Sequence, residues 1–179
     1  MHWRNSTHGY GLAAILFHWL VAVGVIGMFA LGLWMVGLSY YDPNYRDSLA
    51  LHKALGILLF LVVGLRLLWR LANPRPRIEG KVWERRAASW VHRLLYLLLF
   101  ATMIMGYLIS TADGRAIDVF GLFKVPATLT GRNQEDWAGD LHIVLAWSLI
   151  VVASLHALAA LKHAFIDRDN TLRRMLRPR

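Results

Sequence analysis

The chain has 179 residues, of which 57% are hydrophobic and 17% are charged, an apolar share well above that of an ordinary soluble domain. Its formal net charge of +9 is compatible with nucleic-acid binding. However, the basic residues gather at the ends of long apolar stretches, where membrane topology and anionic lipid account for them. The absence of cysteine excludes disulfides, iron–sulfur clusters and covalently attached haem c. Composition therefore favours an integral membrane protein that binds no nucleic acid.

The first two apolar stretches each predict one membrane-spanning helix. Residues 5–41 contain no Asp, Glu, Lys or Arg, so they hold a span at about residues 12–38 and are too long for the apolar part of a cleaved signal peptide. The second span covers about residues 49–71 and carries Arg66 and Arg70 near its end. Long basic side chains at such a depth can reach the headgroups, so we expect both arginines to snorkel.

The second half of the chain predicts two more spans. Residues 94–112 and 141–161 are free of charged side chains, which indicates helices at about residues 89–109 and 140–163. The expected fold class is therefore all-α. We expect one membrane domain over residues 1–179, built as an integral membrane four-helix bundle.

The basic residues predict the orientation of this bundle. The connection between the second and third helices and the segment after the fourth are both rich in Lys and Arg, whereas the other two connections are mixed in charge. The positive-inside rule then places both termini of this multi-pass protein in the cytoplasm. The basic residues concerned are Arg75, Arg77, Lys81, Arg85, Arg86, Lys162, Arg168, Arg173, Arg174, Arg177 and Arg179.

Four histidines lie at matching depths in the predicted spans. His142 and His156 are fourteen residues apart, which puts them on nearly the same face of one helix and roughly 21 Å apart along its axis. His18 on the first helix matches the depth of His156, and His52 on the second matches that of His142. We therefore expect the cross-helix pairs His18/His156 and His52/His142.

Two facing imidazoles in an otherwise apolar core suit a six-coordinate iron, with a haem between the helices. Each histidine on its own is equally compatible with a hydrogen-bonded helix contact. A bare zinc site would normally include cysteine or carboxylate ligands, which the spans lack. A haem-free metal-binding or transporter bundle remains the alternative of a different class.

Several segments resemble the bacterial cytochrome b561 family over nearly the whole length of the chain. They are FHWL at 17–20, LHKALGILLFLVVGLRLLWRL at 51–71, NPRP at 73–76, VHRLLYLLL at 91–99, DLHIVLAWSLIVVASLHALAALKHAF at 140–165 and DNTLRRML at 169–176. The chain looks most similar to a member that passes electrons from superoxide to ubiquinone. The resemblance implies two b haems stacked across the bilayer, with His18, His52, His142 and His156 as ligands to their irons.

Two further histidines suggest a quinone site near the cytoplasmic face. His92 and His163 lie at or near the cytoplasmic ends of their helices, where an interfacial histidine is also ordinary. Imidazole can supply the protons that quinone reduction needs, and the similar family positions favour His163 over His92.

The site that would receive electrons from an external donor is the least defined site in the sequence. Superoxide is an anion that four cations could steer, namely Lys53, Arg115, Lys124 and Arg132. Four acidic residues nearby, Asp113, Asp118, Glu135 and Asp136, offset them. Because two axial imidazoles leave iron no open position, we expect outer-sphere electron transfer. An electron carrier that serves a partner dehydrogenase or hydrogenase is the alternative.

Overall fold

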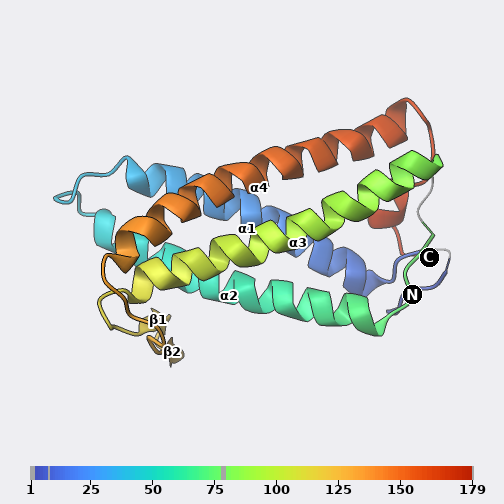
Figure 1. Ribbon diagram of the computed structural model, residues 1–179. Helices are drawn as coiled ribbons and strands as arrows, with labels where there is room; N and C mark the ends of the chain where they lie inside the picture. Colours follow the sequence, from blue (N-terminus) through green and yellow to red (C-terminus); the bar gives the residue numbers. More distant parts are fainter. Residues whose placement is uncertain (1–2, 8, 78–79, 179) are drawn as a thin grey trace. The chain divides into compact units, whose positions relative to one another are not determined.

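A computed structural model describes residues 3–7, 9–77 and 80–178, and four long helices dominate it (Figure 1). They are α1 (Leu12–Val36), α2 (Tyr45–Ala72), α3 (Val82–Thr111) and α4 (Gln134–Phe165). All four are long and apolar enough to cross a membrane. The prediction of an all-α, four-span membrane protein is confirmed.

Three helices begin earlier than the apolar pattern indicates. α2 starts at Tyr45, α3 at Val82 and α4 at Gln134, so each extends by one or two turns beyond the predicted span. Acidic residues occupy the first turn of each one, where they stabilise the positive end of the helix dipole. α1, in contrast, ends at Val36, just before Gly37. Hydropathy marks the part of a helix in hydrocarbon, whereas backbone hydrogen bonding continues into the polar interface.

A small antiparallel hairpin lies between α3 and α4, outside the predicted spans. Its strands are β1 (Ile117–Val119) and β2 (Phe123–Val125). Ile117 and Val119 are buried against Ala54 of α2, with Val119 fully inaccessible. The turn places Phe120 and Gly121 at positive φ, 55° and 72°. The alternation of apolar and polar residues in β1, followed by Gly121, is the sequence signal that could have predicted this hairpin.

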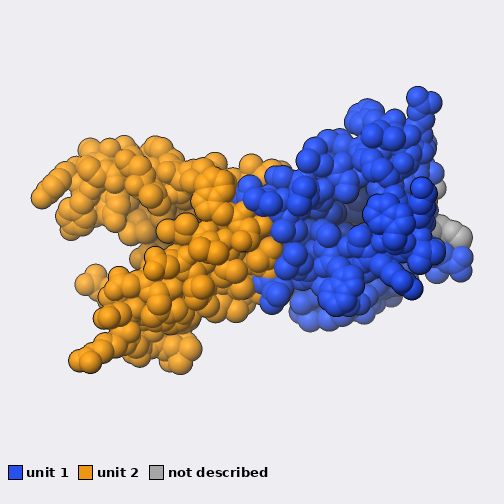
Figure 2. All heavy atoms as spheres, turned by 45° about the horizontal axis from the view of Figure 1, so that its top comes forward, with its two compact units in different colours: residues 1–22, 62–97, 149–179 blue, residues 23–61, 98–148 orange. Residues whose placement is uncertain are grey.

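The chain forms two compact units, and every helix contributes to both. Unit 1 comprises residues 1–22, 62–97 and 149–179, and unit 2 comprises residues 23–61 and 98–148 (Figure 2). Large apolar side chains such as Leu65, Leu97 and Leu155 are exposed along the helices. Lipid tails are as apolar as leucine, so exposing such side chains on a surface that faces the bilayer costs little free energy.

Unit 1 joins three segments that lie far apart in the sequence. The Asn5 amide donates to the carbonyl of Pro74 in the α2–α3 connection at 3.1 Å. Trp19 Nε1 donates to the carbonyl of Met175, in the short 3-10 helix η1 (Arg173–Met175), at 2.7 Å. Arg174 Nη1 donates to the carbonyl of Arg77 at 2.8 Å. The N-terminal segment, the α2–α3 connection and the segment after α4 therefore pack together.

Candidate functional site

Each unit contains one pair of facing histidines. In unit 1, His18 of α1 and His156 of α4 have their ring centroids 6.3 Å apart, at 69°. In unit 2, His52 of α2 and His142 of α4 are also 6.3 Å apart, at 78°. We call these the unit 1 pair and the unit 2 pair. The structure thus brings together both pairs that the depths predict.

The spacing of both pairs suits one metal ion between two imidazoles. An imidazole nitrogen binds a metal at about 2 Å, so two rings that share one ion have their centres roughly 6 Å apart once the ring radius is added. Within the described part of the chain, the single cluster of three or more His, Asp or Glu ligand atoms is Glu84/His163/Asp167. It includes no member of either pair. Because two imidazoles alone make a poor zinc site, this donor set fits the axial positions of a haem.

In the unit 2 pair, a backbone carbonyl orients His142. His142 Nδ1 lies 2.8 Å from the carbonyl oxygen of Thr102, so an Nδ1–H donates there and Nε2 is left for a metal. A methyl group built on Gly106 would come within 3.1 Å of His142 Cε1, and one on Gly32 within 3.4 Å of His52 Cε1. Glycine at these two positions allows α1 and α3 to approach the rings.

In the unit 1 pair, a side chain orients His18. Arg66 Nη2 donates to His18 Nδ1 at 3.0 Å. Arg66 and Arg70 both place their guanidinium carbons 5.4 Å from the centre of the Tyr96 ring. The expectation that both arginines snorkel is therefore wrong for Arg66, which turns inward because an imidazole nitrogen offers it an acceptor. The signal was available, since an ionisable side chain inside a membrane helix is functional by default.

The Arg66 contact also bears on whether a haem fits. With Arg66 donating to Nδ1, a neutral His18 carries its proton on Nε2, and a metal bound at Nε2 would require that proton to move to Nδ1. Arg66 would then need another acceptor. No ion pair joins Arg66 or Arg70 to a carboxylate among the described residues. The carboxylates that a haem carries would meet this need, so the basic cluster fits the cofactor.

The two candidate quinone residues belong to different clusters. His92 of α3 lies 5.2 Å from His156 between ring centroids, at 66°. This is shorter than the roughly 6 Å of two imidazoles on opposite sides of one ion, and it makes His92 a packing neighbour of the unit 1 pair. His163 Nδ1 contacts Asp169 Oδ2 at 2.6 Å and Asp167 Oδ2 at 3.1 Å. The depth argument gave no indication of either arrangement, because it ranks residues along the membrane normal and does not show which way they face.

The cluster around His163 already contains a cation. Lys162 Nζ lies 2.8 Å from Glu84 Oε1 and 2.7 Å from Asp167 Oδ2. Its ammonium group offsets these two carboxylates. Asp169 lies outside the helices. Burial alone would raise its pKa, but hydrogen bonds from Thr171 and His163 outweigh burial, and the pKa lies below its ordinary value.

The residues expected to steer an anion lie in unit 2. Arg115 forms an exposed ion pair with Asp113 at 3.2 Å, and Lys124 stands opposite Asp118 in the hairpin register. Two of the four cations thus have an acidic neighbour.

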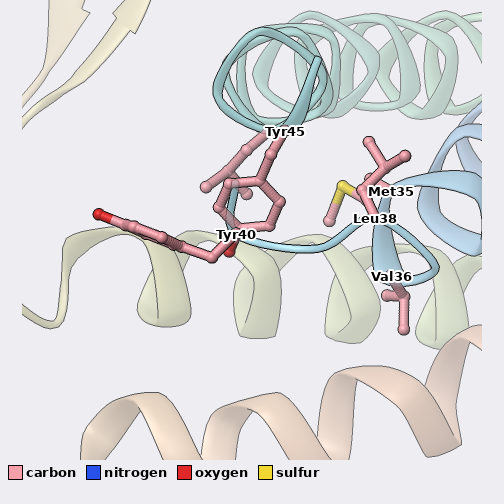
Figure 3. A pocket seen from close by; sticks show the side chains of 6 residues that line it. Met35, Val36, Leu38, Tyr40 and Tyr45 are labelled. Carbon is pink, nitrogen blue, oxygen red and sulfur yellow. The ribbon is translucent and has the colours of Figure 1, made fainter. Parts of the chain in front are cut away.

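A pocket between the end of α1 and the start of α2 is lined by Met35, Val36, Leu38, Tyr40, Tyr45 and Leu49 (Figure 3). Its lining holds no histidine and no charged side chain.

Comparisons with known proteins identify several relatives of this chain. A family model described as prokaryotic cytochrome b561 matches residues 9–178. The chain is 53% identical over 179 residues to cytochrome b561 homolog 2 of Escherichia coli (strain K12), covering 98% of this chain and 95% of that protein. It is 32% identical over 174 residues to probable superoxide oxidase CybB of Yersinia pestis, covering 93% and 95%. It is 26% identical over 177 residues to cytochrome b562 of Cereibacter sphaeroides, covering 96% and 97%.

These matches extend over nearly the whole chain and confirm the family that its motifs resemble. The four helices, the two histidine pairs and the matched length all point to membrane electron transfer with haem b. The chain belongs to the prokaryotic cytochrome b561 family.

Proposed function

We propose that this chain binds two haem b groups, one at each histidine pair, and carries electrons from superoxide outside the bacterial inner membrane to ubiquinone near its cytoplasmic face. The observation that carries this proposal is the pair of equal 6.3 Å ring separations, one in each unit. Bound haem would supply reversible one-electron transfer at these positions. The paired histidines would supply the nitrogens that hold it, and the polar groups beside them would orient those histidines.

The haem-to-protein ratio tests the cofactor proposal. The purified wild-type chain should contain two haem b groups, with a reduced-minus-oxidised spectrum typical of two axial histidines. His18→Ala and His52→Ala should each retain one group, and the double variant should retain none. His163→Ala, which alters a histidine outside both pairs, should retain two. A wild-type chain that contains no haem would refute the proposal and favour the haem-free bundle.

The orientation rests on the packing within unit 1 together with the distribution of basic residues. The N-terminal segment, the α2–α3 connection and the segment after α4 contact one another and together carry nine of the twenty Lys and Arg residues. We therefore place both termini in the cytoplasm. The chain has no native cysteine, so single cysteines introduced at Arg177 and at Thr128 can be labelled in intact cells with an impermeant maleimide. Only the cysteine at position 128 should react, and the opposite pattern would reverse the topology.

Superoxide as the donor is supported by the name of a 32%-identical relative and by the cations of unit 2. Since Arg115 and Lys124 have acidic neighbours, Lys53 and Arg132 are the residues that we propose for steering. The rate of superoxide consumption should fall as ionic strength rises. A rate that is independent of salt contradicts steering. An isolated chain that leaves superoxide untouched and co-purifies with a dehydrogenase or hydrogenase would favour the carrier function instead.

For the acceptor side we propose that His163 delivers protons to the bound quinone. His163 is partly exposed and lies in an acidic cluster that contains none of the paired histidines. His163→Ala should keep both haems but lose quinone reduction, whereas dithionite should still reduce the haems. Unchanged quinone turnover in this variant would exclude His163 from the quinone site. We propose a supporting role for His92 beside His156.

A further inference from the structure

The segment after α4 folds back onto the helix and places a carboxylate on His163. Arg168 adopts a left-handed backbone conformation with φ of 55°, which reverses the chain direction between Asp167 and Asp169. The backbone N–H of Asp169 then donates to the carbonyl of His163 at 3.0 Å. In the same turn Asp169 Oδ2 lies 2.6 Å from His163 Nδ1. A side-chain contact and a backbone contact thus connect the same two residues.

Asp169 itself is held in place. Its other carboxylate oxygen, Oδ1, accepts the backbone N–H of Thr171 at 2.8 Å. The Asp169 and His163 side chains are only 19% and 15% exposed. A short contact between two partly buried groups with restricted motion is the geometry in which a carboxylate fixes the orientation of an imidazole.

A second carboxylate reaches the same nitrogen but has another cation. Asp167 Oδ2 lies 3.1 Å from His163 Nδ1 and also 2.7 Å from Lys162 Nζ. Lys162 offsets the charge of Asp167, whereas among the described residues the one cationic side chain recorded at Asp169 is His163. The lowered pKa of Asp169 keeps its carboxyl group ionised at neutral pH.

We propose that Asp169 is a positioning residue for His163: it holds a proton on Nδ1, so that Nε2 is the nitrogen that gives and regains a proton in quinone reduction. This inference rests on the function proposed above and adds to it the residue that fixes the histidine tautomer. Wherever a buried carboxylate orients a general acid–base histidine, one ring nitrogen binds the carboxylate and the other exchanges the proton.

The proton balance is simple. Reduction of a quinone to a quinol takes two electrons, received singly from reduced haem, and two protons. In each transfer the Nε2–H bond of a doubly protonated His163 breaks and an O–H bond forms at a quinone carbonyl oxygen. The electron pair of the broken bond stays on Nε2. His163 is left neutral with its proton on Nδ1, where Asp169 accepts the hydrogen bond, and water at the membrane surface returns a proton to Nε2.

The test compares Asp169→Asn with Asp167→Asn as the matched control. An asparagine at 169 can donate an amide N–H to Nδ1 and so favour the opposite tautomer. Both variants are purified with haem, reduced anaerobically and mixed with a soluble ubiquinone analogue, and haem reoxidation is followed. Asp169→Asn should slow reoxidation by roughly tenfold to a thousandfold, as expected when a general acid–base histidine holds its proton on the wrong nitrogen. Asp167→Asn should change the rate by less than about threefold, and Asp169→Glu should restore part of it. Equal rates for the two asparagine variants overturn the inference.

Nitrogen NMR of histidine-labelled protein in the reduced, low-spin state gives an answer that does not depend on quinone. The signal of His163, identified by its absence in His163→Gln, should show a proton on Nδ1 in the wild type and not in Asp169→Asn. A proton that stays on Nδ1 in Asp169→Asn overturns the inference. If the wild type fails to pass electrons to quinone, the proposed function fails, while the NMR result still decides whether Asp169 controls His163.

Discussion

The close approach of α3 to the unit 2 pair makes Gly106→Ala a sharp test of the haem site. A methyl group at this position would lie 3.1 Å from Cε1 and 3.4 Å from Nδ1 of His142. Ordinary contacts between carbon atoms are about 3.5–4.0 Å, so the ring would have to move by about half an ångström. That movement would strain the 2.8 Å hydrogen bond to Thr102 and the spacing of the pair.

The balance of free energies predicts a net loss. Alanine is favoured over glycine inside a helix by up to about 1 kcal/mol, whereas overpacking of this kind costs about 1–3 kcal/mol. With the full helix gain, the net loss is at most about 2 kcal/mol, which would weaken haem binding in unit 2 by up to roughly thirtyfold. We therefore expect a haem content between one and two per chain after purification, and faster loss of one haem to an external acceptor.

The control is Gly27→Ala on α1, also in unit 2, where an added methyl group meets nothing within 4 Å. This variant should keep both haems and show equal or slightly higher stability. Pyridine haemochrome analysis against protein concentration measures the haem content, and the rate of haem transfer to apomyoglobin measures the affinity. If Gly106→Ala matches Gly27→Ala in both measurements, the glycine is not required by the histidine and the reasoning is refuted.

Three further predictions follow from the other contacts. Arg66→Leu should lower the midpoint potential of the unit 1 haem by several tens of millivolts in a potentiometric titration, because a nearby cation stabilises the reduced form; an equal shift in Arg70→Leu would mean that only net charge matters. Val119→Ala should destabilise the hairpin by about 1–3 kcal/mol, and unchanged amide hydrogen exchange in its strands would argue against this role. Because the folded-state pKa of Asp169 is lowered, its stabilising effect is present above the ordinary aspartate pKa and is lost as the pH falls through the lowered value. The amide of Thr171 should thus stay protected from exchange at neutral pH, and protection lost near neutrality would contradict this.

Sequence reasoning predicted the four spans because the absence of charge over about twenty residues is enforced by the bilayer. It also predicted which histidines lie at matching depths, since depth along a straight helix follows from residue count alone. It could not predict that Arg66 turns toward His18, because position on a helix does not determine which neighbour a long side chain meets. The contact between Asp169 and His163 depends on a left-handed residue at Arg168, and no glycine marks that turn in the sequence.

The two histidine pairs differ in what holds them, and this difference determines how each can change during evolution. His142 is oriented by the carbonyl oxygen of Thr102 and by the missing side chain of Gly106. Substitution at residue 102 leaves that carbonyl in place. Single substitutions should therefore change the orientation of His142, and with it the redox properties of the unit 2 site, very little. His18 lies beside the guanidinium group of Arg66, a charge that a single nucleotide change can remove. Under the proposed function, redox diversity among related chains should therefore accumulate at the unit 1 pair, while the unit 2 pair stays nearly constant.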